Sequence, residues 1–376
     1  MRISAERFIL NNMKDINIVV SHSPQTYSVF IESGLLHSIF DYIEVKKYNI
    51  FYVISDSNVS DIYVPMVKKS LQEHTEKTVR TYIFEAGEKN KYLQTVEKMW
   101  QDMADNKLDR NVLVIALGGG VVTDMAGFVA ATYLRGVDYI SIPTTLEGMV
   151  DASVGGKTGI NLGHLKNYIG AFRQPKSVLI DVDTLKTLPN RAFLQGYAEV
   201  LKHGLIADRE YFYEASRKFP LDMSTDELIG IISRSVEIKA ELVQEDEYEI
   251  GPRKLLNFGH TIGHVVESLS MNTDEPLFHG EAVSIGMIAE AKISEKLGMI
   301  KESEFKKIED AISQVGLPVR FKGTNSIDSV FDMLITDKKN RGGKIKWTLL
   351  SRIGEADFNI EIGEKFVREG IDYILT

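Results

Sequence analysis

The chain of 376 residues contains no cysteine. It therefore has no disulfide framework, no thiolate nucleophile and no Cys-ligated zinc or iron–sulfur cluster. A metal ion would have to be held by histidines and carboxylates. The absence of cysteine also fits a reducing compartment.

The sequence also has no excess of basic residues over acidic ones. Lys and Arg number 44 against 53 Asp and Glu, which gives a formal net charge of −9. This balance argues against nucleic acid or an anionic membrane surface as a general partner. Any anionic ligand must therefore meet a locally basic pocket.

The sequence also lacks the marks of a secreted or membrane protein. Its first twenty residues contain no uninterrupted apolar run of the length that a secretory signal needs, so we expect a cytoplasmic protein. One nearly apolar span covers residues 112–134, but three glycines interrupt it and Asp124 adds a charge. These features favour a buried strand, turn and helix over a membrane span.

Length and pattern predict two domains. At about 150 residues per domain, the chain is long enough for two or three units. Apolar runs typical of strands alternate with helical stretches in the first half, which predicts an α/β domain with a parallel sheet. These strands are expected at 16–20, 49–55, 79–84, 112–117, 139–144 and 177–182. Helical periodicity dominates afterwards, with one further strand at 345–350, so we predict domains of residues 1–188 and 189–376.

A glycine-rich turn follows the expected strand at 112–117. Gly118, Gly119 and Gly120 precede a helical run, a context in which main-chain N–H groups can approach a pyrophosphate. The spacing differs from G-x-G-x-x-G, so a purely structural turn is an equal interpretation of this segment alone. Thr144 and Thr145 follow the next strand, where open α/β sheets bind ligands. Together the two segments favour a nucleotide.

Asp151 to Lys157 and the pair Lys166-Asn167 form a second polar segment. Two lysines, an aspartate and an asparagine around paired glycines suit phosphate binding. The segment is no Walker A loop, because Asp151 stands where that motif needs its first glycine. A solvated lysine beside a turn is the alternative.

Histidines cluster in the second half. His260 and His264 are four residues apart and share one helix face, and His279 follows after a short interval. The H-E-x-x-H pattern of zinc proteases is absent. Glu281 lies two residues after His279, and Glu199 lies on an upstream predicted helix. Two histidines and one glutamate would make a three-ligand catalytic zinc site. Any one of these histidines, or His203, could instead be structural.

In this order the motifs resemble those of the dehydroquinate synthase family of sugar-phosphate cyclases. The resemblance runs from residues 87–91 to residues 337–339 and covers most of the chain. It implies a Rossmann-like N-terminal domain, a helical C-terminal domain and a homodimer. It also implies an NAD-dependent lyase with Zn²⁺ or Co²⁺ that converts 3-deoxy-D-arabino-heptulosonate 7-phosphate to 3-dehydroquinate and phosphate in the shikimate pathway. NAD would oxidise and then reduce the substrate, so no net redox product is expected.

The resemblance also implies residue roles. It matches Glu199, His260 and His279 to metal ligands, and His264 to a pocket residue outside the metal shell. The positions that match groups holding the substrate phosphate or phosphonate are Lys157, Asn167, Arg253 and one of Lys338 and Lys339, for which we choose Lys339. Other matched substrate positions are Asp151, Lys202, Lys239, Glu249 and Asn257. Arg135 matches an arginine that is contributed to the active site of the neighbouring subunit. The matched NAD positions are Asp56, Glu88, Lys91, Gly119, Gly120, Asp124, Thr144, Thr145, Lys157, Lys166 and Thr187.

Several positions depart from the family pattern. Ala192 replaces a glutamate of the cofactor site, and Glu147 replaces a leucine close to the expected cofactor hydroxyls. Thr123, Ser141 and Leu165 also differ from the usual residues. Neither the metal set nor the phosphate-binding set is affected. We therefore predict retained cyclase chemistry with weaker or altered NAD binding.

Three other functions remain open. The first is another sugar-phosphate cyclase, such as an aminodehydroquinate synthase or a cyclase of sedoheptulose 7-phosphate, although Arg253 and His264 favour a seven-carbon acid. The second is a metal-dependent polyol dehydrogenase, which would accumulate NADH. The third is an inactive paralogue, against which the intact metal set argues.

Overall fold

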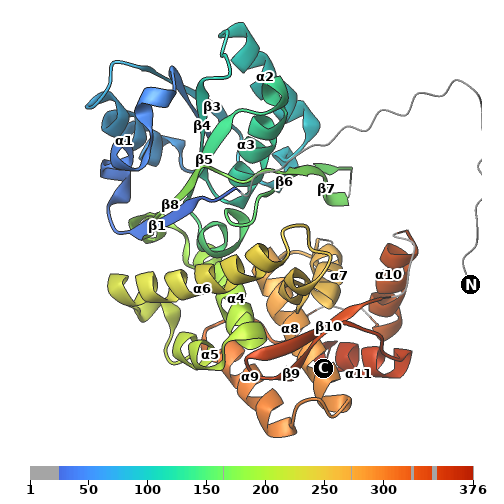
Figure 1. The fold of residues 1–376 in the computed structure, drawn as a ribbon. Helices are drawn as coiled ribbons and strands as arrows, with labels where there is room; N and C mark the ends of the chain where they lie inside the picture. The colour runs from blue at the N-terminus through green and yellow to red at the C-terminus, as the bar shows by residue number, and fades with distance from the viewer. Residues whose placement is uncertain (1–24, 164, 272, 323–325, 341–344, 376) are drawn as a thin grey trace, which may run out of the picture.

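The computed structural model describes residues 25–163, 165–271, 273–322, 326–340 and 345–375. A parallel sheet with helices α1 to α3 forms one part, and helices α4 to α11 form the other (Figure 1). The predicted α/β fold followed by helices is confirmed. The predicted domain boundary between residues 188 and 189 lies just before α4 and stays a prediction. The expected strand at 16–20 lies outside the described residues.

Six parallel strands form the main sheet, in the order β1-β8-β5-β4-β2-β3. Their bounds are β1 Ser28–Glu32, β2 Ile50–Asp56, β3 Thr78–Phe84, β4 Val112–Gly118, β5 Asp138–Pro143 and β8 Ser177–Asp181. Every residue of β4 is buried, which is why the central strands read as continuous apolar runs. Since β2, β4 and β5 are parallel neighbours, Asp56, Gly118 and Pro143 end at the same edge of the sheet.

Helices cover both faces of this sheet. Helix α1 (Ser60–Gln72) packs on one face, in a cluster that contains Leu113 and Ile115 of β4. Helices α2 (Leu93–Asp105) and α3 (Gly120–Thr132) pack on the other face, against Val114 and Ala116. Successive side chains of β4 therefore pack alternately into two hydrophobic cores, one on each face of the sheet.

An antiparallel hairpin, β6 (Lys157–Leu162) and β7 (Leu165–Phe172), leaves the main sheet after β5. The sequence did not predict these strands, because Gly159 and Gly170 lower the strand propensity of the segment. Both glycines are needed for close pairing. A Cβ at Gly170 would lie 2.2 Å from the carbonyl oxygen of Thr158.

The second part of the chain is mostly helical. Its long helices are α4 Asn190–Ala207, α5 Arg209–Ala215, α6 Thr225–Glu245, α7 His260–Ser270, α8 His279–Lys296, α9 Glu302–Gln314, α10 Ile327–Asn340 and α11 Glu364–Leu375. The expected strand at 345–350 is β9 (Trp347–Arg352), and it pairs with the unpredicted β10 (Glu355–Ile360). None of the described helices is long and apolar enough to cross a membrane.

Short helices connect these elements. They are η1 Leu35–His37, η2 Ile39–Tyr42, η3 Val45–Lys47, η4 Glu88–Asn90, η5 Tyr133–Arg135, η6 Gly148–Ala152, η7 Val182–Thr187, η8 Pro220–Asp222 and η9 Pro252–Asn257. η6 is a π-helical turn, a form often found at functional sites. It begins three residues after Thr145.

Candidate active site

Three predicted metal ligands from three helices lie close together. Glu199 lies on α4, while His260 and His279 are the first residues of α7 and α8. The Nε2 atom of His260 lies 3.7 Å from Oε1 of Glu199, and the rings of His260 and His279 are 5.3 Å apart at their centroids. Burial and the nearby Lys202 ammonium lower the pKa of His260 well below its usual value, which keeps the imidazole neutral, the form that binds metals.

The Glu199 carboxylate is buried with few partners. Its residue is 1% exposed, and it pairs with Lys202, three residues along α4. Neither carboxylate oxygen accepts a hydrogen bond of good geometry from the described residues. Buried polar atoms normally have such partners, so these oxygens leave room for a cation.

His264 lies near the same ring pair. Its ring centroid is 5.3 Å from that of His260 and 5.8 Å from that of His279. The predicted placement of His260 and His264 on one helix face is therefore confirmed. The donor atoms of the three rings lie within 4.8 Å of one another, so the three histidines alone form a compact set.

A second group of polar residues lies around the Gly155–Lys157 turn. The buried Arg253 donates from Nη2 to the carbonyl oxygen of Gly155 at 3.0 Å, and Lys157 pairs with Glu249. Asn257 donates to Glu249 at 2.8 Å, so these predicted residues meet in one place. Burial, together with the cations Arg253 and Lys239, lowers the pKa of Lys157 to about 8.

The loop that carries Glu249 and Arg253 is held by Asp246. Its carboxylate accepts hydrogen bonds from the main-chain N–H groups of Ile250, Gly251 and Arg253 at 3.0, 2.7 and 3.2 Å. The sequence did not single out Asp246 for this role. An aspartate that ends a predicted helix, followed five residues later by Gly251 and Pro252, is the signal that could have found it.

Asp151 and two lysines connect the phosphate-binding and metal-binding groups. Lys239 of α6 donates both to the carboxylate and to the carbonyl oxygen of Asp151 in η6. Burial alone would raise the pKa of Asp151, but Lys239 and Lys202 hold it well below its usual value. The carboxylate of Asp151 also lies near that of Glu199, within 4.8 Å between ligand atoms.

The glycine-rich turn and the threonines predicted for NAD lie together. The main-chain N–H of Thr144 donates to the carbonyl oxygen of Gly118 at 2.9 Å. A Cβ at Gly119 would lie 3.0 Å from the methyl group of Thr145, so a larger residue there would crowd the threonine. The Thr144 hydroxyl is buried and has no hydrogen-bond partner among the described residues. The N-terminus of α3 and this hydroxyl suit a phosphate-containing ligand.

A polar network joins the turn to the hairpin. Lys91 donates to Asp124 at 2.6 Å and also to the side chain of Asn167. Asn161 donates to Glu88 at 2.8 Å and accepts from the main-chain N–H of Asn167. The structure therefore places Asn167, matched to the substrate set, in contact with residues of the predicted cofactor set.

Asp56 and Thr187 lie on other elements. The Asp56 carboxylate, at the end of β2, accepts a hydrogen bond from the main-chain N–H of Asn58, and burial raises its pKa. The Thr187 hydroxyl, at the end of η7, is 2.5 Å from the hydroxyl of Tyr63. Asp56 ends at the same sheet edge as the glycine-rich turn.

Two predicted residues are not brought into this group. Arg135 is exposed at the far end of α3, about 20 Å from the glycine-rich turn at 1.5 Å per residue. It has a positive φ of 66°. Lys339 lies in the last turn of α10, and its side chain falls outside the described part of the structure.

A contact between Gln195 and Glu147, near the metal-ligand set, was not predicted from the sequence. Gln195 of α4 donates to Glu147 at 2.8 Å and accepts from the main-chain N–H of Gly280 at 2.9 Å. It therefore ties the segment after β5 to the first turn of α8, next to His279. Burial raises the pKa of Glu147, although His279 and the hydrogen bond from Gln195 oppose this shift.

Glu267 was also missed. Its carboxylate accepts a hydrogen bond from Lys166 at 2.6 Å and lies 3.4 Å from Nδ1 of His279. Burial opposes ionisation, but His279 and Lys166 hold the pKa of Glu267 at about 2. Its position seven residues after His260, on the same helix face, is the signal that could have found it.

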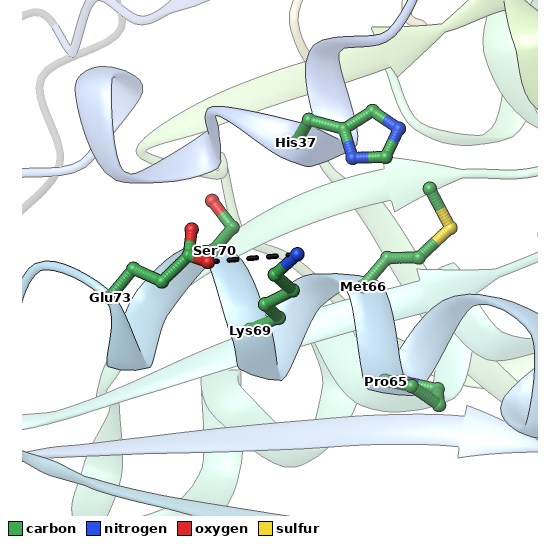
Figure 2. A pocket seen from close by; sticks show the side chains of 6 residues that line it. All are labelled: His37, Pro65, Met66, Lys69, Ser70 and Glu73. Atoms are coloured by element: carbon green, nitrogen blue, oxygen red, sulfur yellow. Dashed lines mark ion pairs between the residues drawn. The ribbon is translucent and has the colours of Figure 1, made fainter.

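A surface hollow lies elsewhere, between η1 and α1. Figure 2 shows its lining side chains, with Lys69 and Glu73 paired across one turn of α1 at 3.7 Å. None of its lining residues belongs to the predicted sites. The lining residues are His37, Pro65, Met66, Lys69, Ser70 and Glu73.

Comparison with known families agrees with this geometry. The N-terminal family model of 3-dehydroquinate synthase matches residues 81–195, and the C-terminal model matches residues 196–340. A 3-dehydroquinate synthase of Prochlorococcus marinus (strain AS9601) is 40% identical over 352 residues, which cover 92% of this chain and 96% of the relative. One of Thermodesulfovibrio yellowstonii is 41% identical over 343 residues, with coverage of 90% and 94%.

Solved structures of similar fold include two other synthases. A 2-deoxy-scyllo-inosose synthase, complexed with carbaglucose-6-phosphate, NAD⁺ and Co²⁺, has a TM-score of 0.84 at 27% identity, covering 92% of this chain and 96% of its own. A 2-epi-5-epi-valiolone synthase from Streptomyces hygroscopicus, with NAD⁺ and Zn²⁺ bound, has a TM-score of 0.83 at 28% identity, with coverage of 95% and 98%. A glycerol dehydrogenase of Schizosaccharomyces pombe, at 15% identity and a TM-score of 0.64, shares the fold alone.

Proposed function

Because the chain belongs to the 3-dehydroquinate synthase family, we propose that it converts 3-deoxy-D-arabino-heptulosonate 7-phosphate to 3-dehydroquinate and phosphate. The reaction would use NAD and one divalent cation, Zn²⁺ or Co²⁺. The observation that carries the proposal is the convergence of Glu199, His260 and His279 in a chain that also gathers the cations Lys157 and Arg253 around the Gly155–Lys157 turn.

The donor set fits a divalent cation. Glu199 offers two buried oxygens that accept no hydrogen bond from the described part of the chain, and His260 offers a neutral imidazole. One carboxylate and two imidazoles make a three-ligand site with a position left for substrate, and such a donor set accepts zinc or cobalt. We assign His264 to the substrate pocket because the buried Glu199 carboxylate, paired with Lys202 but accepting no hydrogen bond from the described residues, would gain a ligand in the metal.

The cofactor site would be built at the edge of the sheet. The first turn of α3 supplies N–H groups from Gly120 onwards, and the buried Thr144 hydroxyl is free to bind a ligand. Lys91, Asp124 and Glu88 would hold polar groups of NAD. The solved synthases of similar fold bind NAD⁺ in their structures, which supports this assignment.

When bound, the metal would acidify the substrate hydroxyl that is oxidised, and NAD would take up a hydride and return it within the same turnover. The side chains of this chain hold the substrate during that cycle. Lys157 and Arg253 would neutralise the charge that grows on the departing phosphate. Glu249 and Asn257 fix the position of Lys157 and the η9 loop before substrate binds.

Asp151, Lys239 and Lys202 would bind the substrate between phosphate and metal. Ion pairs of Lys239 and Lys202 hold these side chains in place, so the groups need little reorganisation. Such a site would also hold the opened chain in the conformation needed for ring closure, which lowers the entropic cost of that step.

The assembly and domain division remain part of the proposal. We infer domains of residues 1–188 and 189–376, with the site between the sheet edge and the start of α4, α7 and α8. Arg135 is exposed and far from this site, which supports a homodimer in which it serves the neighbouring subunit.

One experiment tests the function. Metal-loaded protein is incubated with NAD and 3-deoxy-D-arabino-heptulosonate 7-phosphate, while phosphate release and NADH absorbance are followed together. Phosphate release without net NADH, abolished by a chelator, supports the proposal. Accumulating NADH would instead support a polyol dehydrogenase. Phosphate released only from sedoheptulose 7-phosphate or from the amino analogue of the substrate would move the chain to another cyclase.

A further inference from the structure

Glu267 lies between a residue of the hairpin and a residue of the metal-ligand set. Its Oε1 atom accepts a hydrogen bond from Nζ of Lys166 in β7 at 2.6 Å. Its Oε2 atom lies 3.4 Å from Nδ1 of His279, the first residue of α8. The Glu267 residue is 6% exposed, whereas about half of the Lys166 side chain is exposed. One buried carboxylate therefore serves two partners from distant parts of the chain.

The neighbourhood fixes Glu267 firmly. It follows His260 by seven residues and His264 by three, so all three side chains share one face of α7. The carbonyl oxygen of Glu267 accepts a hydrogen bond from the Ser270 hydroxyl, which in turn accepts from the main-chain N–H of Leu277. This contact holds the segment before α8 against the end of α7.

We propose that Glu267 is a positioning residue that makes metal binding and NAD binding strengthen each other. The inference rests on the proposed function, because it uses the metal set of Glu199, His260 and His279. A carboxylate on Nδ1 orients the His279 ring and leaves Nε2 as the metal-binding nitrogen. Such an acceptor also makes the imidazole a stronger donor to the metal.

Lys166 competes for the same carboxylate. While Lys166 is paired with Glu267, its ammonium partly neutralises the carboxylate, which weakens the interaction of Glu267 with His279. In the proposed function, Lys166 binds NAD, so the cofactor would take this cation from Glu267. The carboxylate would then act on His279 alone, and the metal would bind more tightly. By thermodynamic reciprocity, the metal must then tighten NAD binding by the same factor.

The test measures binding without turnover. Zn²⁺ affinity of metal-free protein is measured by competition with a chromogenic chelator, in the presence and absence of NAD⁺. For the unmodified protein we expect NAD⁺ to tighten Zn²⁺ binding by about 5- to 150-fold. For Glu267→Gln we expect Zn²⁺ affinity to fall by about 10- to 100-fold, the usual loss for such a partner. The effect of NAD⁺ on that affinity should disappear.

Lys166→Met separates positioning from simple structural support. Without its competitor, Glu267 should hold His279 as it does when NAD is bound, so Zn²⁺ affinity without NAD⁺ should match or exceed that of the unmodified protein. The coupling should again be lost. A purely structural ion pair would instead make both variants bind Zn²⁺ more weakly while the NAD⁺ effect remained, and this result would overturn the inference.

The matched control is Glu309→Gln. Glu309 is also a buried carboxylate, and its partners include Arg320 at 2.7 Å and Tyr373 at 2.8 Å, but it lies on α9. The Glu309→Gln variant should leave both the Zn²⁺ affinity and the effect of NAD⁺ on that affinity unchanged. If Glu267→Gln behaves like this control, the inference is wrong while the metal site stands. If the unmodified protein binds no Zn²⁺, or His279→Ala binds it normally, the proposed metal set itself fails.

Discussion

The buried carboxylate of Glu290 accepts a hydrogen bond of 2.6 Å from the main-chain N–H of Gly259, the residue before His260. It accepts a second, of 3.1 Å, from the N–H of Ile262. The first N–H groups of a helix need partners, and here a neighbouring helix supplies the acceptor from its interior. Helix α8 thus fixes the start of α7, where a proposed metal ligand lies.

We expect Glu290→Leu to destabilise the protein by about 2–6 kcal/mol, because two buried N–H groups lose their acceptor at about 1–3 kcal/mol each. Glu290→Gln keeps one acceptor oxygen and should cost less. Urea unfolding followed by circular dichroism measures both. The exposed Glu302→Gln on α9 is the control and should change stability by less than about 0.5 kcal/mol. Equal unfolding midpoints for Glu290→Leu and the control would contradict this assignment.

Removal of metal ligands should abolish both metal content and activity. We expect Glu199→Gln and His279→Asn to lose bound metal and to lower phosphate release by about a thousandfold, since metal catalysis supplies several kcal/mol at about 1.4 kcal/mol per tenfold. His264→Asn should keep its metal but lose activity. Metal content by elemental analysis separates the two classes. Loss of metal from His264→Asn with retention in Glu199→Gln would favour the three-histidine set.

Lys157 should give phosphate binding a pH dependence. Its pKa of about 8 lies below its usual 10.5, so its charge is lost as pH rises through 8. We expect the KM for substrate to rise above pH 8 in the unmodified protein. In Lys157→Arg, which stays charged, KM should be flat from pH 7 to about 9. A KM that rises equally in both proteins would show that another group titrates.

The same shift has a consequence for stability, with the opposite sign. The unfolded chain holds a proton on Lys157 between pH 8 and 10.5, where the folded chain has released it. Stability from this group therefore rises with pH across that window. The Lys157→Arg variant should lack this rise in urea titrations at different pH values.

Glu147 should weaken binding of NAD. It is a carboxylate on the segment after Thr144 and Thr145, which we assign to the cofactor site, and NAD carries a pyrophosphate. We expect Glu147→Gln, which keeps the hydrogen-bonding shape beside Gln195, to bind NAD⁺ several-fold more tightly. Isothermal titration with NAD⁺ measures this. Equal affinities would show that Glu147 has no net effect on the cofactor.

Much of the fold could be predicted because its central strands are buried on both faces. Residues 112–117 read as an unbroken apolar run, and the glycines after them ended the strand as expected. The hairpin could not be predicted in this way. Its stability depends on close main-chain approach at Gly159 and Gly170, which leaves no pattern of alternating side chains.

The candidate site could be predicted from the sequence only in part. Histidines and carboxylates in a cysteine-free chain pointed to the metal set, and the resemblance added the substrate and cofactor residues. The spacing from His260 could have placed Glu267 near the metal set, but its contact with Lys166, like that of Gln195 with Gly280, joins residues far apart in sequence. Lys166 is 101 residues from Glu267, and Gly280 is 85 residues from Gln195. No local pattern reports such a contact.

The proposed ligands lie on α4, α7 and α8, so only the folded chain can bring them together. A metal that binds only this state stabilises it by about 2.7 kcal/mol at one hundred times its dissociation constant. Without cysteine, the unfolded chain is a weak competitor for zinc, so this linkage should operate almost in full. Metal supply would then control how much of the protein survives heat or proteolysis, and a cell short of zinc would lose the protein as well as its activity.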